Sequence, residues 1–281
     1  TGHGDLVEAH DGSWWMVFLG IRPNNRWMHY HTLGRETFLA PVKWGNGGWP
    51  VVGDGGKVSL EMEAEGAFCA ESAAQDVRAE KVIDDFDGDQ LGLEWNFLRN
   101  PYRQDWSVNE RKGCLALRGS QINLDDIDSP AFVGRRQKHF NCTATTLIDF
   151  KPLKEGEEAG LSVYMDERHH YEIAIVLISG RRNIIVRKRV GSLASIAARE
   201  EIDDKDVILR IESAPERYHF SYKTKDESFK RIAEGESRYL SSEVTGGFTG
   251  TYLVLYATGN GKRSSSVAYF DWFEYQAEDE A

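Results

Sequence analysis

Residues 5–19, DLVEAHDGSWWMVFL, have the sequence pattern of a β-hairpin. Two β-type runs, residues 5–9 and 13–19, are separated by the triplet His10-Asp11-Gly12. An Asp-Gly pair supplies the positive φ that a tight hairpin turn requires. The stretch therefore predicts two antiparallel strands near the start of the chain.

Gly, Asn and Asp residues continue to separate short β-type runs along the rest of the chain. The 3.6-residue periodicity of apolar residues that indicates a helix is almost absent. A further strand is expected at residues 37–44, closed by a glycine-rich turn at residues 45–48. From residue 84 onward we count about a dozen candidate strands, at the spacing expected of a β-sandwich. The clearest are residues 114–117, 143–150, 160–165, 171–178, 183–189, 207–213, 218–223, 251–257 and 267–275. The fold class predicted is all-β.

A change of composition divides the chain. Residues 53–82 contain a glycine cluster and a run of small and charged residues, which is typical of an irregular linker. Strand-like sequence resumes at residue 84. We therefore expect one part at residues 1–82, with the linker at its end, and a β-sandwich at residues 83–281.

Composition excludes two classes of partner. The 281 residues carry a formal net charge of −11, whereas phosphate binding requires a basic face, so a nucleic-acid partner is not expected. No apolar run approaches the ~20 residues of a membrane span, so no membrane partner is expected either. An acidic surface suits an enzyme that acts on a neutral polysaccharide. The chain begins at Thr1 beside strand-like sequence, which we interpret as a cut within a longer polypeptide.

Three motifs carry a resemblance to a known family. They are Gly2-His3-Gly4-Asp5 followed by Trp14-Trp15, then Leu33-Gly34-Arg35-Glu36-Thr37, then Gly48-Trp49-Pro50. In order and spacing they resemble the last blade of glycoside hydrolase family 43, in its β-xylosidase branch. Residues 84–276 resemble the sandwich domain that follows the propeller in that branch. The resemblance implies part of a five-bladed β-propeller followed by a concanavalin-like β-sandwich.

The resemblance also implies a reaction. Family members hydrolyse glycosides with inversion, which needs an acid and a base, two carboxyl groups roughly 6.5–9.5 Å apart. In the family these groups precede the Gly-His-Gly-Asp motif. We therefore expect no catalytic residue in this chain, and the N-terminal half of the same enzyme as its partner, either as a separate chain or as a nicked fragment.

Two substrate-binding residues are carried over from the motifs. Arg35 matches the family arginine that binds the sugar of the first subsite, and its guanidinium offers a fixed fork to adjacent hydroxyls. The alternative is a surface arginine paired with Glu36. His3 matches the histidine near the propeller axis, in the floor of the site. Its alternatives are a link to an axial Ca²⁺ and a structural imidazole. Asp5 is expected on the same strand face as His3.

Phe248 is the third substrate-binding candidate. It matches the aromatic residue that the family's sandwich domain extends across the mouth of the propeller. Glycines on both sides favour a tight projecting turn. The alternative is packing in the core against Tyr252 or Tyr269.

No cofactor is expected to be required, but a structural Ca²⁺ site is one hypothesis. Asp84 and Asp271 stand near the two ends of the sandwich and could supply oxygen ligands. The alternative is solvated acids, with Asp271 on an outward strand face. The adjacent pair His169 and His170 is not expected to bind one ion, because neighbouring residues of a strand point to opposite faces.

Three functions remain open at this point. The first is a β-xylosidase that releases terminal xylose from xylo-oligosaccharides or xylan. The second is an α-L-arabinofuranosidase acting on arabinoxylan, and the third is a non-catalytic carbohydrate-binding module. The motifs of the first 52 residues argue against the third. A secreted enzyme is expected, with an intracellular one as the alternative.

Overall fold

The computed structural model describes residues 1–24, 29–62, 81–203, 205–224 and 227–277. In these ranges nearly all regular structure is β-strand; the helical elements are α1 (Ser242–Thr245) and the 3₁₀ turns η1 (Arg103–Asp105) and η2 (Ser237–Leu240). The all-β prediction is confirmed. Across the same ranges, no helix has the length and apolar character needed to cross a membrane.

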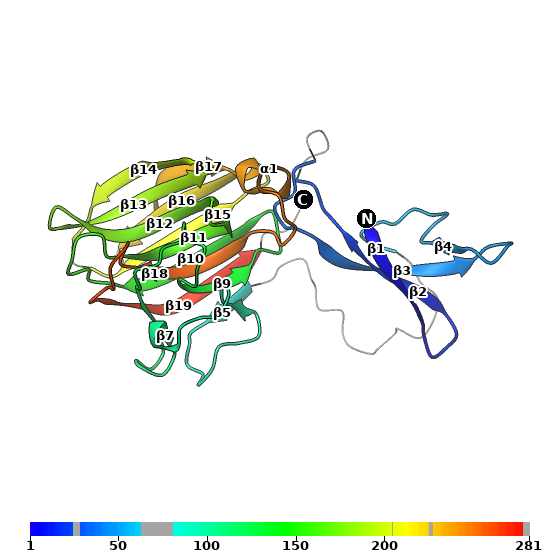
Figure 1. Cartoon of the computed structure of the whole chain (residues 1–281), viewed down its shortest axis with the longest axis horizontal. Helices are drawn as coiled ribbons and strands as arrows, with labels where there is room; N and C mark the ends of the chain where they lie inside the picture. Colours follow the sequence, from blue (N-terminus) through cyan, green and yellow to red (C-terminus); the bar gives the residue numbers. More distant parts are fainter. Residues whose placement is uncertain (25–28, 63–80, 204, 225–226, 278–281) are drawn as a thin grey trace. The chain divides into compact units, whose positions relative to one another are not determined.

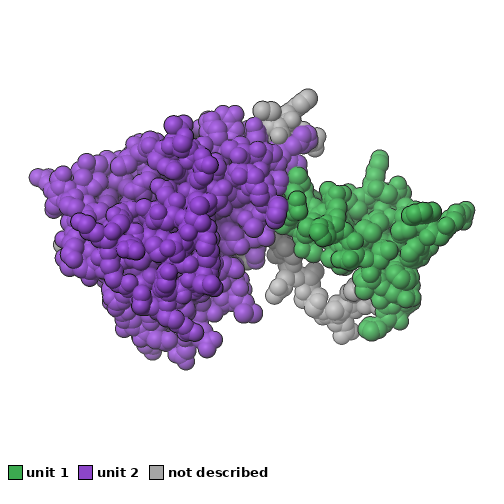
Figure 2. Space-filling model, in the orientation of Figure 1, with its two compact units in different colours: residues 1–22, 34–77 green, residues 23–33, 78–281 purple. Residues whose placement is uncertain are grey.

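The chain divides into two compact units (Figure 2). The first contains residues 1–22 and 34–77, and the second contains residues 23–33 and 78–281. The predicted division at residue 82 stays a prediction. Among the described residues, 23, 24 and 29–33, which we call the strap, group with the second unit, and so do residues 81 and 82.

The first unit is a four-stranded antiparallel sheet in the order β1-β2-β3-β4 (Figure 1). Its strands are β1 (Gly2–Glu8), β2 (Trp14–Gly20), β3 (Glu36–Trp44) and β4 (Pro50–Val52). The predicted hairpin is present: Gly12 has a φ of +80°, and its N–H donates to the carbonyl of Ala9 at 2.9 Å. The Asp11 carboxylate closes the turn by accepting from the Ser13 N–H at 3.0 Å. Residues 53–62 form no strand, in agreement with the predicted linker, and residues 63–80 lie outside the described part.

The second unit is a sandwich of two antiparallel sheets (Figure 1). The eight-stranded sheet has the order β17-β16-β15-β10-β19-β8-β7, with β5 also pairing with β19. Its strands are β5 (Lys81–Asp84), β7 (Trp106–Ser107), β8 (Leu115–Arg118), β10 (Cys142–Asp149), β15 (Val207–Ser213), β16 (Arg217–Thr224), β17 (Lys230–Glu236) and β19 (Val267–Ala277).

The seven-stranded sheet has the order β14-β13-β12-β11-β18-β9-β6. Its strands are β6 (Trp95–Asn96), β9 (Ala131–Arg136), β11 (Glu158–Asp166), β12 (His169–Ile178), β13 (Arg181–Val190), β14 (Leu193–Glu201) and β18 (Tyr252–Thr258). Every clear strand predicted in the sandwich is present, with ends that shift by a few residues.

The core lies between the two sheets. On β12, Tyr171, Ile173 and Ile175 alternate into it, each at most 1% exposed. Phe220 and Phe270 belong to the same cluster from the other sheet and are fully buried. Burying one such side chain contributes roughly 1.5–3 kcal/mol, so this layer supplies most of the stabilisation of the sandwich.

The strap is held within the second unit by hydrogen bonds to its backbone. The His31 N–H donates to Glu243 Oε2 at 2.9 Å, and the Thr251 N–H donates to the carbonyl of Thr32 at 2.8 Å. Arg136 Nη2 donates to the carbonyl of Leu33 at 2.7 Å, and Leu33 is 1% exposed. The strap is therefore part of the packed structure of the second unit.

The outer face of the seven-stranded sheet, opposite the core, carries a buried ion network that composition did not predict. Arg187 binds both oxygens of Glu158, at 2.8 and 2.6 Å, and also contacts Glu172. Glu172 is in turn 2.7 Å from His170 Nδ1, and His170 Nε2 is 3.0 Å from Asp125. As expected, the neighbouring His169 points elsewhere, to Asp166 at 2.8 Å.

We predict that His170 makes the stability of the sandwich fall in alkaline solution. Burial alone would lower the pKa of His170, but its hydrogen bonds with Asp125 and Glu172 raise it from 6.5 to about 9. The protonated ring therefore stabilises the fold fully below pH ~6.5, and this contribution, on the order of 3 kcal/mol, is lost as the pH rises through ~9. Melting temperatures of the chain between pH 5.5 and 9.5 measure it.

The matched variants are His170→Gln and His169→Gln. The first should have a lower melting temperature at pH 6 and lose the alkaline decline, while the second should keep the decline. An unchanged alkaline decline in His170→Gln would contradict this assignment.

Candidate active site

A β-bulge near the start of β1 sets the direction of His3. Gly2 pairs with Leu19 and Asp5 pairs with Val17, so His3 and Gly4 together oppose the single residue Phe18. His3 has a φ of +55°, and bulges of this kind re-aim a side chain. The bulge also overturns the expected alternation, because Asp5 shares its sheet face with Gly2 rather than with His3.

Gly4 leaves room for the side chains of Met16 and Phe18 beside this bulge. A Cβ placed at this position would lie 2.9 Å from Met16 Sδ and 3.3 Å from Phe18 Cβ. Both distances are shorter than ordinary van der Waals contacts. A larger residue here would displace the Met16 side chain and crowd Phe18.

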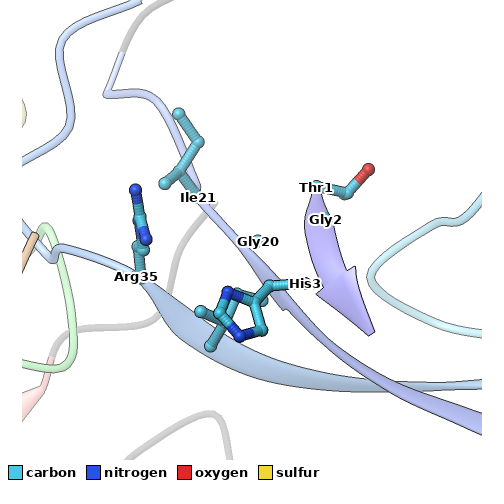
Figure 3. Close-up of a pocket in the computed structure, with 7 residues that line it drawn as sticks. Thr1, Gly2, His3, Gly20, Ile21 and Arg35 are labelled. Carbon is cyan, nitrogen blue, oxygen red and sulfur yellow. The ribbon is translucent and has the colours of Figure 1, made fainter. Parts of the chain in front are cut away.

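His3 and Arg35 line the same pocket (Figure 3). Its volume is about 370 Å³, and its wall is completed by Thr1, Gly2, Leu19, Gly20 and Ile21. His3 comes from β1 and Arg35 immediately precedes β3, so two strands that are not neighbours in the sheet supply the two polar groups. The structure thus brings together two residues that the sequence separates by about thirty positions.

The polar and apolar sides of this pocket suit a sugar. Imidazole and guanidinium nitrogens can hydrogen-bond to hydroxyl groups, and Leu19 and Ile21 offer apolar surface to carbon–hydrogen faces. Glu36, the alternative partner of Arg35, has both carboxylate oxygens bound by Arg22, each at 2.9 Å.

Phe248 lies in the second unit, on a turn between glycines. Gly246, Gly247 and Gly250 have φ values of +72°, +87° and +75°, which confirms the tight projecting turn. Phe248 is 56% exposed, so the alternative of core packing is wrong. Its role at a propeller mouth stays a prediction.

The acids proposed for Ca²⁺ have other partners. Asp84 accepts from the Phe86 N–H at 2.9 Å and from the Trp95 indole at 2.6 Å, so both its oxygens are engaged. Asp271 is exposed on β19, as the alternative expects, 3.9 Å from the Cys114 sulfur. Among the described residues no group of three or more His, Cys, Asp or Glu side chains could hold a metal ion. A Ca²⁺ site at Asp84 and Asp271 stays a prediction.

Comparison with known proteins agrees with this geometry. Residues 83–276 match the family model of the β-xylosidase C-terminal concanavalin A-like domain, and residues 1–50 match the model of glycosyl hydrolases family 43. The chain belongs to glycoside hydrolase family 43. The predicted propeller part and the concanavalin-like sandwich are both confirmed by these matches and by the two units of the fold.

Individual family 43 relatives are similar over nearly the whole chain. A non-reducing end α-L-arabinofuranosidase of Bacteroides ovatus is 42% identical over 99% of this chain and 51% of its own length. A xylosidase/arabinosidase of Butyrivibrio fibrisolvens is 30% identical over 97% and 52%. The structure of a family 43 protein of Bacillus licheniformis superposes with a TM-score of 0.87 at 31% identity, covering 98% and 53%. The chain spans about half the length of the curated relatives it matches.

Sequence reasoning missed two features near these sites. The apolar wall of the pocket, Leu19 and Ile21, was not singled out because both residues continue an apolar strand pattern. The sequence did contain an indication of the ion network, because Glu172 and Arg187 interrupt two apolar strands. In the structure these two residues pair directly across β12 and β13. An opposite-charge cross-strand pair in such strands indicates a buried or partly buried ion pair.

We predict that Phe248→Ala hardly changes the stability of the chain. A mostly exposed side chain contributes little to the core, so the free energy of unfolding should fall by less than about 1 kcal/mol. Phe220→Ala is the matched control, because Phe220 is fully buried and its loss should cost about 3–5 kcal/mol. Urea denaturation measures both. A loss above about 2 kcal/mol for Phe248→Ala would show that the ring packs in the core after all.

Proposed function

We propose that this chain is the C-terminal portion of an inverting exo-glycosidase that releases terminal xylose from xylo-oligosaccharides and xylan. The observation that carries the proposal is the pocket that joins His3 and Arg35 in a chain of family 43. Arg35 binds hydroxyls of the first-subsite sugar, and its charge favours ionisation of a neighbouring catalytic carboxylate. His3 forms part of the floor of the site.

In this proposal the catalytic acid and base come from outside this chain. Inverting hydrolysis needs two carboxyl groups with room for a water between them. The curated relatives are about twice as long as the chain, so they have ample sequence for these groups. The N-terminal half of the same enzyme is the partner that we propose.

The exposed apolar residues of the first unit support such a partner. Val17 and Leu39 pair across one face of the sheet and are 40% and 49% exposed, and Leu6 and Trp44 on the other face are 39% and 46% exposed. An isolated sheet with apolar residues exposed on both faces is not stable in water. Neighbouring propeller blades on each side would cover them.

An α-L-arabinofuranosidase is the second candidate. The relative from Bacteroides ovatus carries that name at 42% identity, whereas the relative from Butyrivibrio fibrisolvens is named for both activities. Parallel assays on p-nitrophenyl β-D-xyloside and p-nitrophenyl α-L-arabinofuranoside in the assembled enzyme distinguish the two candidates.

We predict that the chain of 281 residues does not hydrolyse either substrate by itself. Without an acid and a base, most of the rate enhancement is lost. Adding the N-terminal half of the enzyme should restore turnover. Robust activity of the purified chain alone would show that its own carboxylates perform the catalysis.

We predict that Arg35→Ala lowers kcat/KM of the assembled enzyme by about ten- to two-hundredfold, because a hydrogen bond to a charged donor contributes roughly 1.5–3 kcal/mol. Arg35→Lys should recover only part of the loss, since an ammonium cannot reproduce the fork. Phe248→Ala is the comparison and should mainly raise KM. If kcat/KM of Arg35→Ala stayed within twofold of the parent, the substrate would bind elsewhere.

A further inference from the structure

A second hollow lies in the sandwich, on the outer face of the seven-stranded sheet. Its volume is about 160 Å³. Strands β11, β12, β13 and β18 form its floor, and two loops, residues 121–128 and 259–262, form its rim. It lies entirely within the second unit and shares no residue with the pocket of His3 and Arg35.

The floor of this hollow is charged and rigid. The guanidinium of Arg187 is held by Glu158 and Glu172, whose side chains are 0% and 2% exposed. The hydroxyl of Tyr256 donates to Glu158 Oε1 at 2.6 Å. Removing such charges from water costs several kcal/mol per ion. Because the ion pairs must offset this cost, the loss of one partner would leave a buried charge uncompensated, and the network keeps its geometry only with all partners present. The two buried carboxylates therefore fix the guanidinium of Arg187, whose side chain is 24% exposed, beneath the opening.

The charges at and beneath the floor of this smaller hollow nearly cancel. Three carboxylates, Asp125, Glu158 and Glu172, face the cations Arg187 and Arg189 and the ring of His170. Hydrogen bonds with Asp125 and Glu172 raise the pKa of His170 above neutrality, so the ring is protonated at pH 7. A balanced floor binds neither a free anion nor a free cation preferentially, and the acids Asp126 and Asp128 of the adjoining hollow disfavour an anion further. The chemistry fits a neutral ligand with many hydroxyl groups.

Two asparagine side chains on the rim have hydrogen-bonding atoms to offer. Asn260 uses its Nδ2 to donate to the Gly156 carbonyl at 2.8 Å, and Asn123 uses its Oδ1 to accept from the Asp125 N–H at 2.8 Å. Within the described ranges no hydrogen bond engages Asn260 Oδ1 or Asn123 Nδ2. One acceptor and one donor thus remain for hydroxyl groups.

A wider hollow of about 570 Å³ continues from the same two asparagines. Its lining adds Gln121, Asp126 and Asp128, which can hydrogen-bond to hydroxyls, and Ile127, which is 78% exposed. An exposed isoleucine gives an apolar surface for the carbon–hydrogen face of a sugar ring. The smaller hollow has room for one ring, and the wider one has room for the units that follow.

We propose that this outer face of the sandwich binds a neutral pentose polymer, with one xylose unit above Arg187 between Asn123 and Asn260 and the next units over Ile127. The choice of xylose rests on the proposed function. The site would hold the polysaccharide independently of the pocket that contains His3 and Arg35.

Titration of the isotope-labelled chain with xylose and with xylotriose tests the proposal by nuclear magnetic resonance. Xylotriose should shift the side-chain amide signals of Asn123 and Asn260. Asn260→Gly, which suits the φ of +49° at this position, should weaken xylotriose binding at least tenfold. Ile127→Ala, an exposed position with no risk to folding, should weaken xylotriose at least threefold but leave xylose unchanged.

Two controls distinguish binding at this site from binding elsewhere on the chain. Asn109→Ala removes an asparagine elsewhere on the sandwich surface and should have no effect, and Arg35→Ala should leave these amide shifts intact. No shift at Asn123 and Asn260 at saturating xylotriose, or shifts that disappear with Arg35→Ala, would overturn the proposal. Because binding is measured on the chain without hydrolysis, an inactive assembled enzyme would refute the proposed function and leave this site standing.

Discussion

Every apolar face of a β-sheet must be covered, and this constraint governs both units of the chain. In the sandwich the two sheets cover each other, and Tyr171, Ile173 and Phe270 lie fully or almost fully buried between them. The four-stranded sheet of the first unit exposes Leu39 and Trp44 on opposite faces. The two units thus differ: the sheets of the sandwich cover each other's apolar faces, whereas the four-stranded sheet leaves apolar residues exposed on both of its faces.

The sequence predicted most of the long strands of the sandwich, but it missed the inner strand β9 as well as the edge strand β14. β12 and β13 were found because both contain clusters of β-branched residues, such as Ile173 and Ile175 in β12 and residues 184–186 in β13. β14 at residues 193–201 escaped because most of its residues are exposed on an edge, where alternation is not required. β5 was assigned in part to the linker because only its pairing with β19 makes residues 81–84 a strand.

The candidate site shows a similar limit. The motifs identified His3 and Arg35 through their resemblance to family 43, but strict alternation placed Asp5 on the face of His3. A bulge of one residue reverses that face, and nothing in the composition of the first strand marks where the extra residue falls. The network of Glu158, Glu172 and Arg187 depends on three separate strands, so its geometry required the fold, although the charges themselves were visible.

The strap has a consequence for how the gene segments that encode the two units can recombine. Among the described residues, the chain enters the second unit at residue 23, leaves it after residue 33 and is again in it from residue 81 onward. A gene fusion that transferred only residues 83–281 would deliver a sandwich without Leu33, and Glu243 and Arg136 would lose their backbone partners. Recombination that separates the two units would therefore destabilise the sandwich. We expect the sequences of both units to be inherited together rather than to be exchanged independently between proteins.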